Sequence, residues 1–267
     1  MDLDAEYDNR ARVADSAAII ARWAQDAAAF RDAWPCAEPG IPYGAGERER
    51  LDLFLPEGDP HAPLAVFIHG GYWQALDRSW ASHCARGLVM AGVAVAVPSY
   101  DLCPHVPLAR IVEQMRNAVG LLHRRTGQRM LAIGHSAGGH LAAMLMATDW
   151  AARGLPERLV PSAIPISGVF ELEPLRPTRI GQGLQLTEAE AQALSPRNLP
   201  SPGGALHCVV GDAESTEFLR QTRDFAAAWG GSHESLPGAN HFTVLDPMAD
   251  PASPLVARAR AMAGALA

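Results

Sequence analysis

Short, continuous apolar runs separated by helical segments constrain the fold of this 267-residue chain more than any other feature. Such runs cover residues 64–68, 93–97, 130–133, 163–166 and 206–210, and each is followed within two residues by Gly, Pro or Ser. Strands that are apolar throughout are buried on both faces, as in parallel sheets covered by helices. The intervening segments with helical apolar spacing are 78–91, 108–125, 137–153, 217–229 and 254–266. This alternation predicts an α/β fold with a mainly parallel, doubly wound sheet.

Segments outside this alternation complete the expected organisation. Residues 11–31 repeat apolar side chains at helical spacing, which predicts an amphipathic N-terminal helix. A Pro- and Gly-rich link over 35–46 leads to an early strand over 48–55 with one solvated face. Residues 172–202, with a short helix expected at 187–194, lie between two core strands. We expect this stretch to form a small cap over the ligand-binding edge of the sheet, and a surface connection without function is the alternative.

Composition is compatible with one domain over residues 1–267. Apolar residues make up 48% of the chain and charged residues 19%, which is ordinary for a globular protein of this length. The net charge of −7, without any basic block, argues against a nucleic-acid partner. The four cysteines lack C-x-x-C or metal-ligand spacing, so we expect free thiols in a reducing compartment and no zinc site: Cys36, Cys84, Cys103 and Cys208.

The N-terminus begins with acidic residues instead of the basic and then apolar pattern of a signal peptide: Asp2, Asp4, Glu6 and Asp8. No uncharged apolar stretch reaches the roughly 18 residues that a membrane span needs. We therefore expect a cytoplasmic protein without a membrane partner.

The pentapeptide Gly134-His135-Ser136-Ala137-Gly138 lies between an apolar strand and an Ala-rich helix. This matches G-x-S-x-G in the strand–turn–helix context of a nucleophile elbow, in which the serine hydroxyl stands above the sheet edge of an α/β hydrolase. The helix N-terminus that follows favours developing negative charge. We therefore predict that Ser136 is a catalytic nucleophile, and a purely structural turn is the alternative.

A second glycine-containing loop, His69-Gly70-Gly71-Tyr72-Trp73, directly follows the first buried strand. This is the position of the oxyanion loop in lipases and esterases, where uncovered backbone N–H groups bind a carbonyl oxygen. An N–H group of Gly71 or Tyr72, together with that of Ala137, would complete the oxyanion hole. The alternative is a glycine turn that only packs two strands closely together.

The remaining triad members follow from the chain order nucleophile, acid, histidine. His241 lies after the last strand-like segment and is the only histidine beyond His233, so we predict that it is the general base. Three carboxylates follow the strand that ends at Gly211, and the candidates for the acid are Glu214 and Asp212. We favour Glu214, because a side chain three residues beyond the strand can curl back to the histidine, whereas Glu217 suits the first turn of the next helix.

Taken together, the His69–Trp73 loop, the elbow at Ser136, the run Glu214-Ser215-Thr216-Glu217-Phe218 and Asn240-His241-Phe242 resemble the kynurenine formamidase (arylformamidase) branch of the α/β hydrolases. The likeness extends over residues 43–245. In that branch the acid opens the acidic-Ser-x-Glu-Phe run, often as Asp, which corresponds to Glu214 here. The resemblance implies hydrolysis of N-formyl-L-kynurenine to kynurenine and formate, a step of tryptophan catabolism.

The expected reaction is acyl transfer to Ser136 without a metal or an organic cofactor. The substrate would be a small acyl compound, and an aromatic one could stack on Tyr72 and Trp73, although these side chains could equally be core. A broad carboxylesterase or thioesterase is the alternative within enzymes, and a non-catalytic binding module is a more remote one. The sequence leaves open a homodimer, and whether the N-terminal helix packs on its own subunit or on a neighbour.

Overall fold

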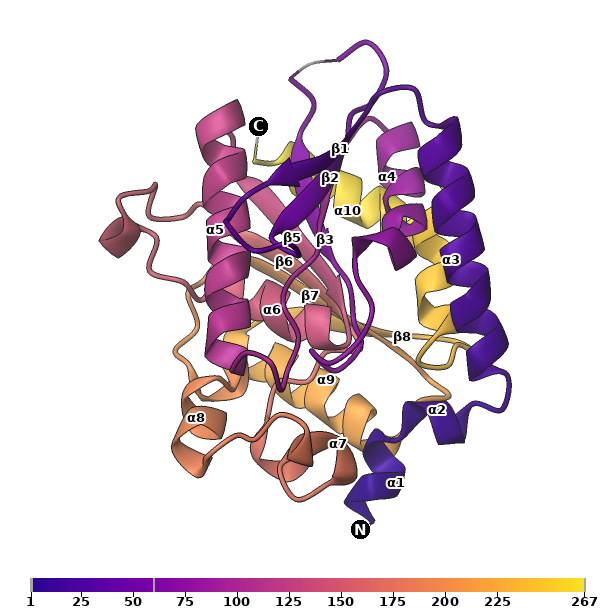
Figure 1. Ribbon diagram of the computed structural model, residues 1–267, viewed down its shortest axis with the longest axis vertical. Coiled ribbons are helices and arrows are strands. Elements are labelled where there is room, and N and C mark those ends of the chain that lie inside the picture. Colours follow the sequence, from indigo (N-terminus) through magenta and orange to yellow (C-terminus); the bar gives the residue numbers. More distant parts are fainter. Residues whose placement is uncertain (1, 60, 267) are drawn as a thin grey trace.

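The computed structural model describes residues 2–59 and 61–266 and is organised around an eight-stranded sheet (Figure 1). The strands lie side by side in the order β1-β2-β4-β3-β5-β6-β7-β8. The first two are antiparallel to their neighbours, and all later neighbours are parallel. The strand bounds are β1 Ala37–Pro42, β2 Arg50–Phe54, β3 Leu64–Ile68, β4 Ala94–Pro98, β5 Met130–His135, β6 Ser162–Ile166, β7 Ala205–Gly211 and β8 Ser232–Leu236. This arrangement is the α/β-hydrolase fold.

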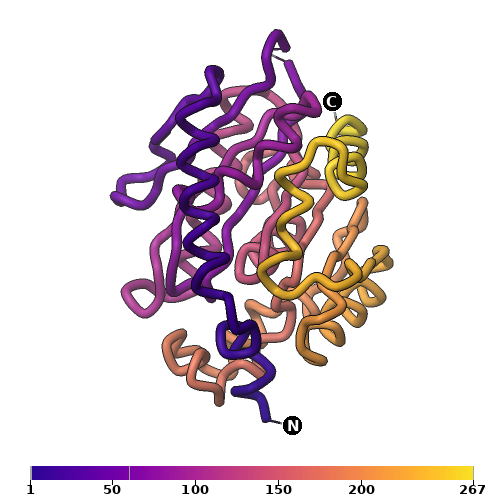
Figure 2. The backbone as a smooth tube through the Cα atoms, turned by 90° about the vertical axis from the view of Figure 1, so that its right-hand side faces the viewer, coloured from indigo at the N-terminus to yellow at the C-terminus, as the bar shows by residue number. Residues whose placement is uncertain are grey.

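Helices cover both faces of the sheet (Figures 1 and 2). One face packs against α3 Ser16–Ala33, α4 Arg86–Met90 and α10 Pro254–Gly264, and the other packs against α5 Leu108–Thr126, α6 Ala137–Met146 and α9 Thr216–Trp229. Alternate residues of one strand enter different cores, since Val66 belongs to the α5–α6 core and Phe67 to the α3–α10 core. A strand buried in this way must be apolar at every position, which explains the continuous runs in the sequence.

The N-terminal helix begins later than the expected 11–31. Two short helices, α1 Leu3–Tyr7 and α2 Asn9–Arg12, precede α3, and Val13 between α2 and α3 has an extended backbone. The Asp8 carboxylate accepts a hydrogen bond from the Ala11 N–H and thereby caps α2 as a separate turn. The helix α3 packs on its own chain, where Trp23 and Phe30 enter the core.

The structure corrects three other expectations. The segment 78–91 is not one helix but two 3₁₀ turns, Arg78–Trp80 and Ser82–Ala85, followed by α4, and the Ser82 hydroxyl bonds the Arg78 carbonyl there. The expected helix over 137–153 ends at Met146, with a 3₁₀ turn at Ala151–Arg153. The link over 35–46 contains β1, whose irregular register between Glu38 and Ile41 accommodates Pro39 and Gly40 at the sheet edge.

The segment 172–202 contains two 3₁₀ turns and two short helices, α7 Arg179–Gln182 and α8 Glu188–Ala193. The helix α8 has a complete capping box between Thr187 and Glu190. Among the residues that the structure describes, no helix is both long enough and apolar enough to cross a membrane.

Candidate active site

Ser136 occupies the turn between β5 and α6 in a conformation that residues other than glycine seldom adopt, with φ 55° and ψ −117°. Its N–H donates to the carbonyl of Ile166 at 2.8 Å, which ties the turn to β6. The close approach requires glycine at 138, because a Cβ there would lie 2.0 Å from the carbonyl oxygen of Ile68. Surrounding contacts therefore maintain a strained turn that sets Ser136 at the N-terminus of α6, as in a nucleophile elbow.

His241 and Glu214 are in direct contact, with His241 Nδ1 2.6 Å from Glu214 Oε2. Both side chains are buried. An ionised carboxylate only accepts hydrogen bonds, so Nδ1 carries the proton of the neutral ring and Nε2 presents a lone pair. This is the tautomer that a general base facing a serine hydroxyl requires.

The other oxygen of Glu214 is also engaged. Glu214 Oε1 accepts hydrogen bonds from the Gly211 N–H at 2.8 Å and from the Ser167 hydroxyl at 2.5 Å. Ser167 stands at the end of β6 with a positive φ of 49°. Its role was missed in the sequence, although a Ser-Gly pair directly after a buried strand is a signal for this edge of the sheet. These donors hold the carboxylate toward His241.

Asp212, the other candidate acid, points elsewhere. Its carboxylate is exposed and accepts a hydrogen bond from the Gly238 N–H at 2.7 Å. The structure therefore brings Glu214, and not Asp212, to His241.

The oxyanion loop packs directly against the nucleophile. A Cβ at Gly70 would lie 3.1 Å from Ser136 Cβ, so only glycine allows this spacing without a shift. Within residues 2–59 and 61–266, the N–H groups of Gly71, Tyr72 and Ala137 donate to no protein acceptor. They are therefore free to donate to a substrate oxygen near Ser136.

His69, the first residue of this loop, fixes the loop through contacts with Tyr100 and Gly70. Its ring stacks on Tyr100 with centroids 4.2 Å apart, and its Nδ1 lies 2.8 Å from the Gly70 carbonyl. The Tyr100 hydroxyl donates to the His69 carbonyl at 2.9 Å. Burial lowers the pKa of His69 to about 4, so the ring is neutral and donates from Nδ1.

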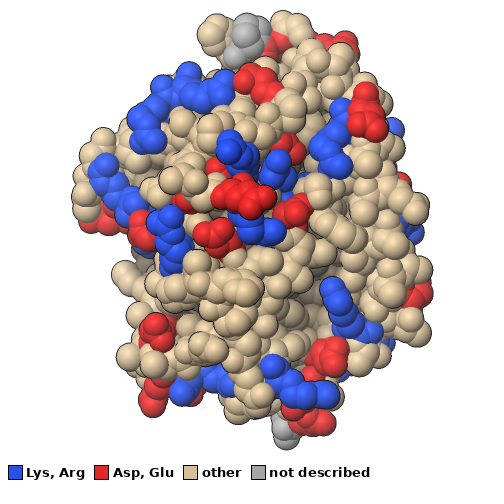
Figure 3. All heavy atoms as spheres, viewed as in Figure 1, with Lys and Arg blue, Asp and Glu red and all other residues tan. Residues whose placement is uncertain are grey.

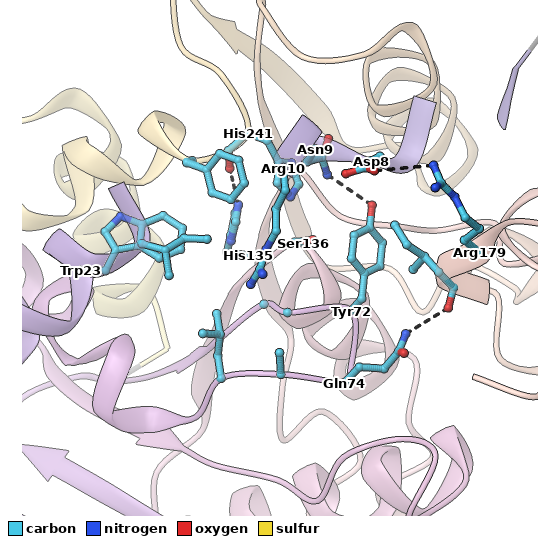
Figure 4. A pocket seen from close by; sticks show the side chains of 17 residues that line it. Asp8, Asn9, Arg10, Trp23, Tyr72, Gln74, His135, Ser136, Arg179 and His241 are labelled. Atoms are coloured by element: carbon cyan, nitrogen blue, oxygen red, sulfur yellow. Dashed lines mark hydrogen bonds and ion pairs between the residues drawn. The ribbon is translucent and has the colours of Figure 1, made fainter. Parts of the chain in front are cut away.

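Ser136 and His241 line one cavity of about 470 Å³ (Figure 4). Neither the Ser136 hydroxyl nor His241 Nε2 makes a hydrogen bond within the described part of the chain, and both groups line the cavity. Apolar and aromatic side chains form much of the wall: Ile20, Trp23, Tyr72, Leu76, Ile180 and Phe242. Polar and charged lining residues are Asp8, Asn9, Arg10, Gln74, His135 and Arg179. The size suits a small organic molecule.

The two aromatic residues of the loop have different environments. Tyr72 lines the cavity, and its hydroxyl donates to the Tyr7 carbonyl at 2.7 Å. Trp73 is fully buried and packs edge-on against His140, with ring centroids 4.9 Å apart. The structure therefore corrects the expectation that Trp73 contacts substrate, since this side chain is core.

His135, next to the nucleophile, was not predicted to have a role. Its Nε2 lies 2.8 Å from the carbonyl oxygen of His241, and the two rings are 4.8 Å apart. Burial lowers the pKa of His135 well below its usual value, with a further contribution from His241, so the neutral ring donates from Nε2. This bond fixes the backbone of His241, the predicted general base.

Comparison with known proteins is consistent with this geometry. The BD-FAE family model matches residues 51–159. The kynurenine formamidase of Salmo salar is 31% identical over 225 residues, which cover 79% of this chain and 76% of the relative. A crystal structure of a proposed thioesterase from Silicibacter sp. is 38% identical with a TM-score of 0.90, over 96% of this chain and 98% of that one.

A more distant structure supports the fold alone. The metagenomic carboxylesterase EstE1 is 18% identical with a TM-score of 0.76, over 94% of this chain and 96% of that one. The chain therefore belongs to the α/β-hydrolase family and is a serine hydrolase of the esterase or formamidase type.

Proposed function

We propose that this hydrolase removes a formyl group from an aryl formamide, with N-formyl-L-kynurenine as substrate and kynurenine and formate as products. The main support is the similarity to kynurenine formamidases over about three quarters of their length. The aromatic Tyr72 beside Ser136 in one cavity is compatible with an aryl substrate.

In the proposed mechanism the Ser136 hydroxyl attacks the formyl carbon while His241 Nε2 takes its proton. The carbonyl oxygen becomes negative and accepts hydrogen bonds from the N–H groups of Gly71 or Tyr72 and of Ala137. His241 then protonates the leaving arylamine, and the C–N bond breaks to leave a formyl ester on Ser136. Water, deprotonated by His241, then attacks the ester carbon, the bond from this carbon to Ser136 Oγ breaks, and the His241 imidazolium returns the proton to Oγ as formate leaves. Glu214 stabilises the imidazolium in both steps.

A broad carboxylesterase or thioesterase is the second candidate. It is favoured by the 38% identity to a proposed thioesterase that spans nearly the whole chain. The two functions differ in the acyl group, because a formamidase needs room only for formyl, whereas an esterase also accepts acetyl and butyryl.

The test compares kcat/KM for N-formyl-L-kynurenine, p-nitrophenyl acetate and p-nitrophenyl butyrate, with Ser136→Ala as the blank. We expect the formamide to react with by far the highest kcat/KM, and Ser136→Ala to lower kcat by about a millionfold. Turnover of the activated esters alone would identify an esterase. Full activity of Ser136→Ala on all three compounds would refute the assignment of the nucleophile.

A further inference from the structure

The first helices of the chain form one wall of the active-site cavity. Asp8, Asn9 and Arg10 line it together with Ser136, although they are more than 120 residues away in the sequence. Hydrogen bonds hold this segment in place, since Asn9 Nδ2 donates to the Tyr72 hydroxyl at 3.2 Å and the Tyr7 hydroxyl donates to Glu217 at 3.0 Å. These bonds fix the backbone of Arg10 beside the cavity, and its exposed side chain lies at the rim.

Two arginines line the cavity, and only one of them, Arg179, lies close to carboxylates in the part of the chain that the structure describes. Arg179 lies 4.0 Å from Asp8 and 3.7 Å from Asp4, so two carboxylates offset its charge. The Arg10 guanidinium has no ion pair and no side-chain hydrogen bond among the described residues. Figure 4 shows Asp8 joined to Arg179 at one side of the cavity and Arg10 apart from that pair.

A free guanidinium at an active-site cavity has a definite chemical preference. It is charged at every physiological pH, and its planar N–H groups match the two oxygens of a carboxylate. The protein as a whole carries −7, and charges of both signs are mixed over the face seen in Figure 3. A substrate carboxylate that binds to this net negative protein would therefore need a local cation as its partner.

We propose that Arg10 binds a carboxylate on the leaving-group part of the substrate, so that preferred substrates have an apolar body with a carboxylate at the far end. Apolar side chains of the cavity wall, such as Trp23 and Ile180, would contact the body of such a molecule. The inference deepens the proposed function, on which it rests: N-formyl-L-kynurenine is an aryl formamide whose far end is an α-amino acid. Arg10 would then be a specificity residue that takes no part in the acyl-transfer chemistry.

The test uses N-formyl-L-kynurenine and ortho-formamidoacetophenone, a neutral compound with the same aryl formamide but no amino-acid group. The ratio of their kcat/KM values is measured for the wild type and for Arg10→Gln, Arg10→Lys and Arg12→Gln. We expect Arg10→Gln to lower this ratio at least about tenfold, mainly through KM of the charged substrate, and Arg10→Lys to restore part of it. Arg12 is the matched control, because it lies on the same short helix and is exposed like Arg10, but contacts the Ala5 carbonyl and Glu6 instead of lining the cavity.

An unchanged ratio in Arg10→Gln would overturn the inference, and so would an equal fall in Arg12→Gln, which would indicate only a general charge effect. A second substrate pair, para-acetoxyphenylpropanoate and its primary amide, distinguishes failure of the Arg10 inference from failure of the formamidase proposal. If the wild type cleaves neither formamide, the formamidase proposal fails. The role of Arg10 is then tested by the ratio of kcat/KM for the carboxylate ester to kcat/KM for its amide, measured in the wild type and in Arg10→Gln. If the formamides are cleaved and neither ratio changes, only the role of Arg10 fails.

Discussion

The carboxylate beside His241 shows how the position of one residue decides its chemistry. Glu214 reaches Nδ1 at 2.6 Å from a turn that begins at Gly211, and two donors occupy its other oxygen. Asp212 starts closer to the strand, but its side chain turns outward to Gly238. Reach and direction, rather than residue type, separate the two acids.

This difference predicts opposite results for two matched substitutions. Glu214→Gln keeps the shape but can no longer fix the imidazole tautomer or stabilise the imidazolium, so kcat should fall by about ten-thousandfold. Asp212→Asn should leave kcat within about twofold, since the exposed side chain touches no reacting group. Steady-state kinetics on one activated ester, with both variants checked for folding by circular dichroism, measures the two effects. A large loss in Asp212→Asn with an active Glu214→Gln would reverse the assignment.

At the scale of elements, α3 is an integral part of the core of its own subunit. Phe30 is buried and packs against Phe54 of β2, with ring centroids 5.0 Å apart. Trp23, two turns earlier, is buried between the sheet and the cavity and lies edge-on to His135. The helix thus connects the stability of the sheet to the wall of the active site.

We therefore expect Phe30→Ala to lower the free energy of unfolding by about 3–5 kcal/mol through the cavity it creates. Gln25→Ala, at an exposed position of the same helix, should change it by less than about 0.5 kcal/mol. Urea unfolding at two protein concentrations measures both. Because the helix packs on its own chain, the midpoint of Phe30→Ala should not depend on concentration, and a marked dependence would instead indicate exchange of the helix between subunits.

At the scale of the whole molecule, four buried histidines link stability to pH. Burial lowers the pKa of His69, His83 and His140 to about 4, and that of His135 well below its usual value. The unfolded chain binds protons at these rings near pH 6.5, whereas the folded chain resists protonation down to about pH 4. Stability is therefore complete above about pH 6.5 and is lost as the pH falls toward 4.

Each of the three rings with a pKa of about 4 should cost on the order of 2 kcal/mol of stability at pH 5, and His135 adds a loss in the same direction. We expect Tm to fall by at least about 10 °C between pH 7 and pH 5, which scanning calorimetry at matched ionic strength would measure. His83→Gln should flatten the decline, because it removes one of the titrating groups. A Tm that stays constant over this range would show that the buried rings do not bear on stability.

The local sequence pattern alone was sufficient to predict the central strands of the sheet. The five apolar runs all became parallel strands, since burial on both faces requires apolar residues at every position. The elbow at Ser136 was also predictable from local sequence. A turn between a strand and a helix with glycine at 134 and 138 has few other conformations available. The predicted order of serine, acid and histidine then located His241.

Other features depend on contacts between distant parts of the chain, which no local pattern records. The choice of Glu214 depends on Ser167 of another strand, and the burial of Trp73 depends on its packing against His140. The edge strand β1 was hidden by Pro39 and Gly40, since only pairing with β2 stabilises it. The sequence by itself thus determined the sheet, the turn at Ser136 and the location of His241 after the last strand, because burial and turn geometry act locally. Only the tertiary structure decided which carboxylate contacts His241 and placed Arg10 at the cavity that Ser136 lines, because those arrangements arise from packing of segments far apart in the chain.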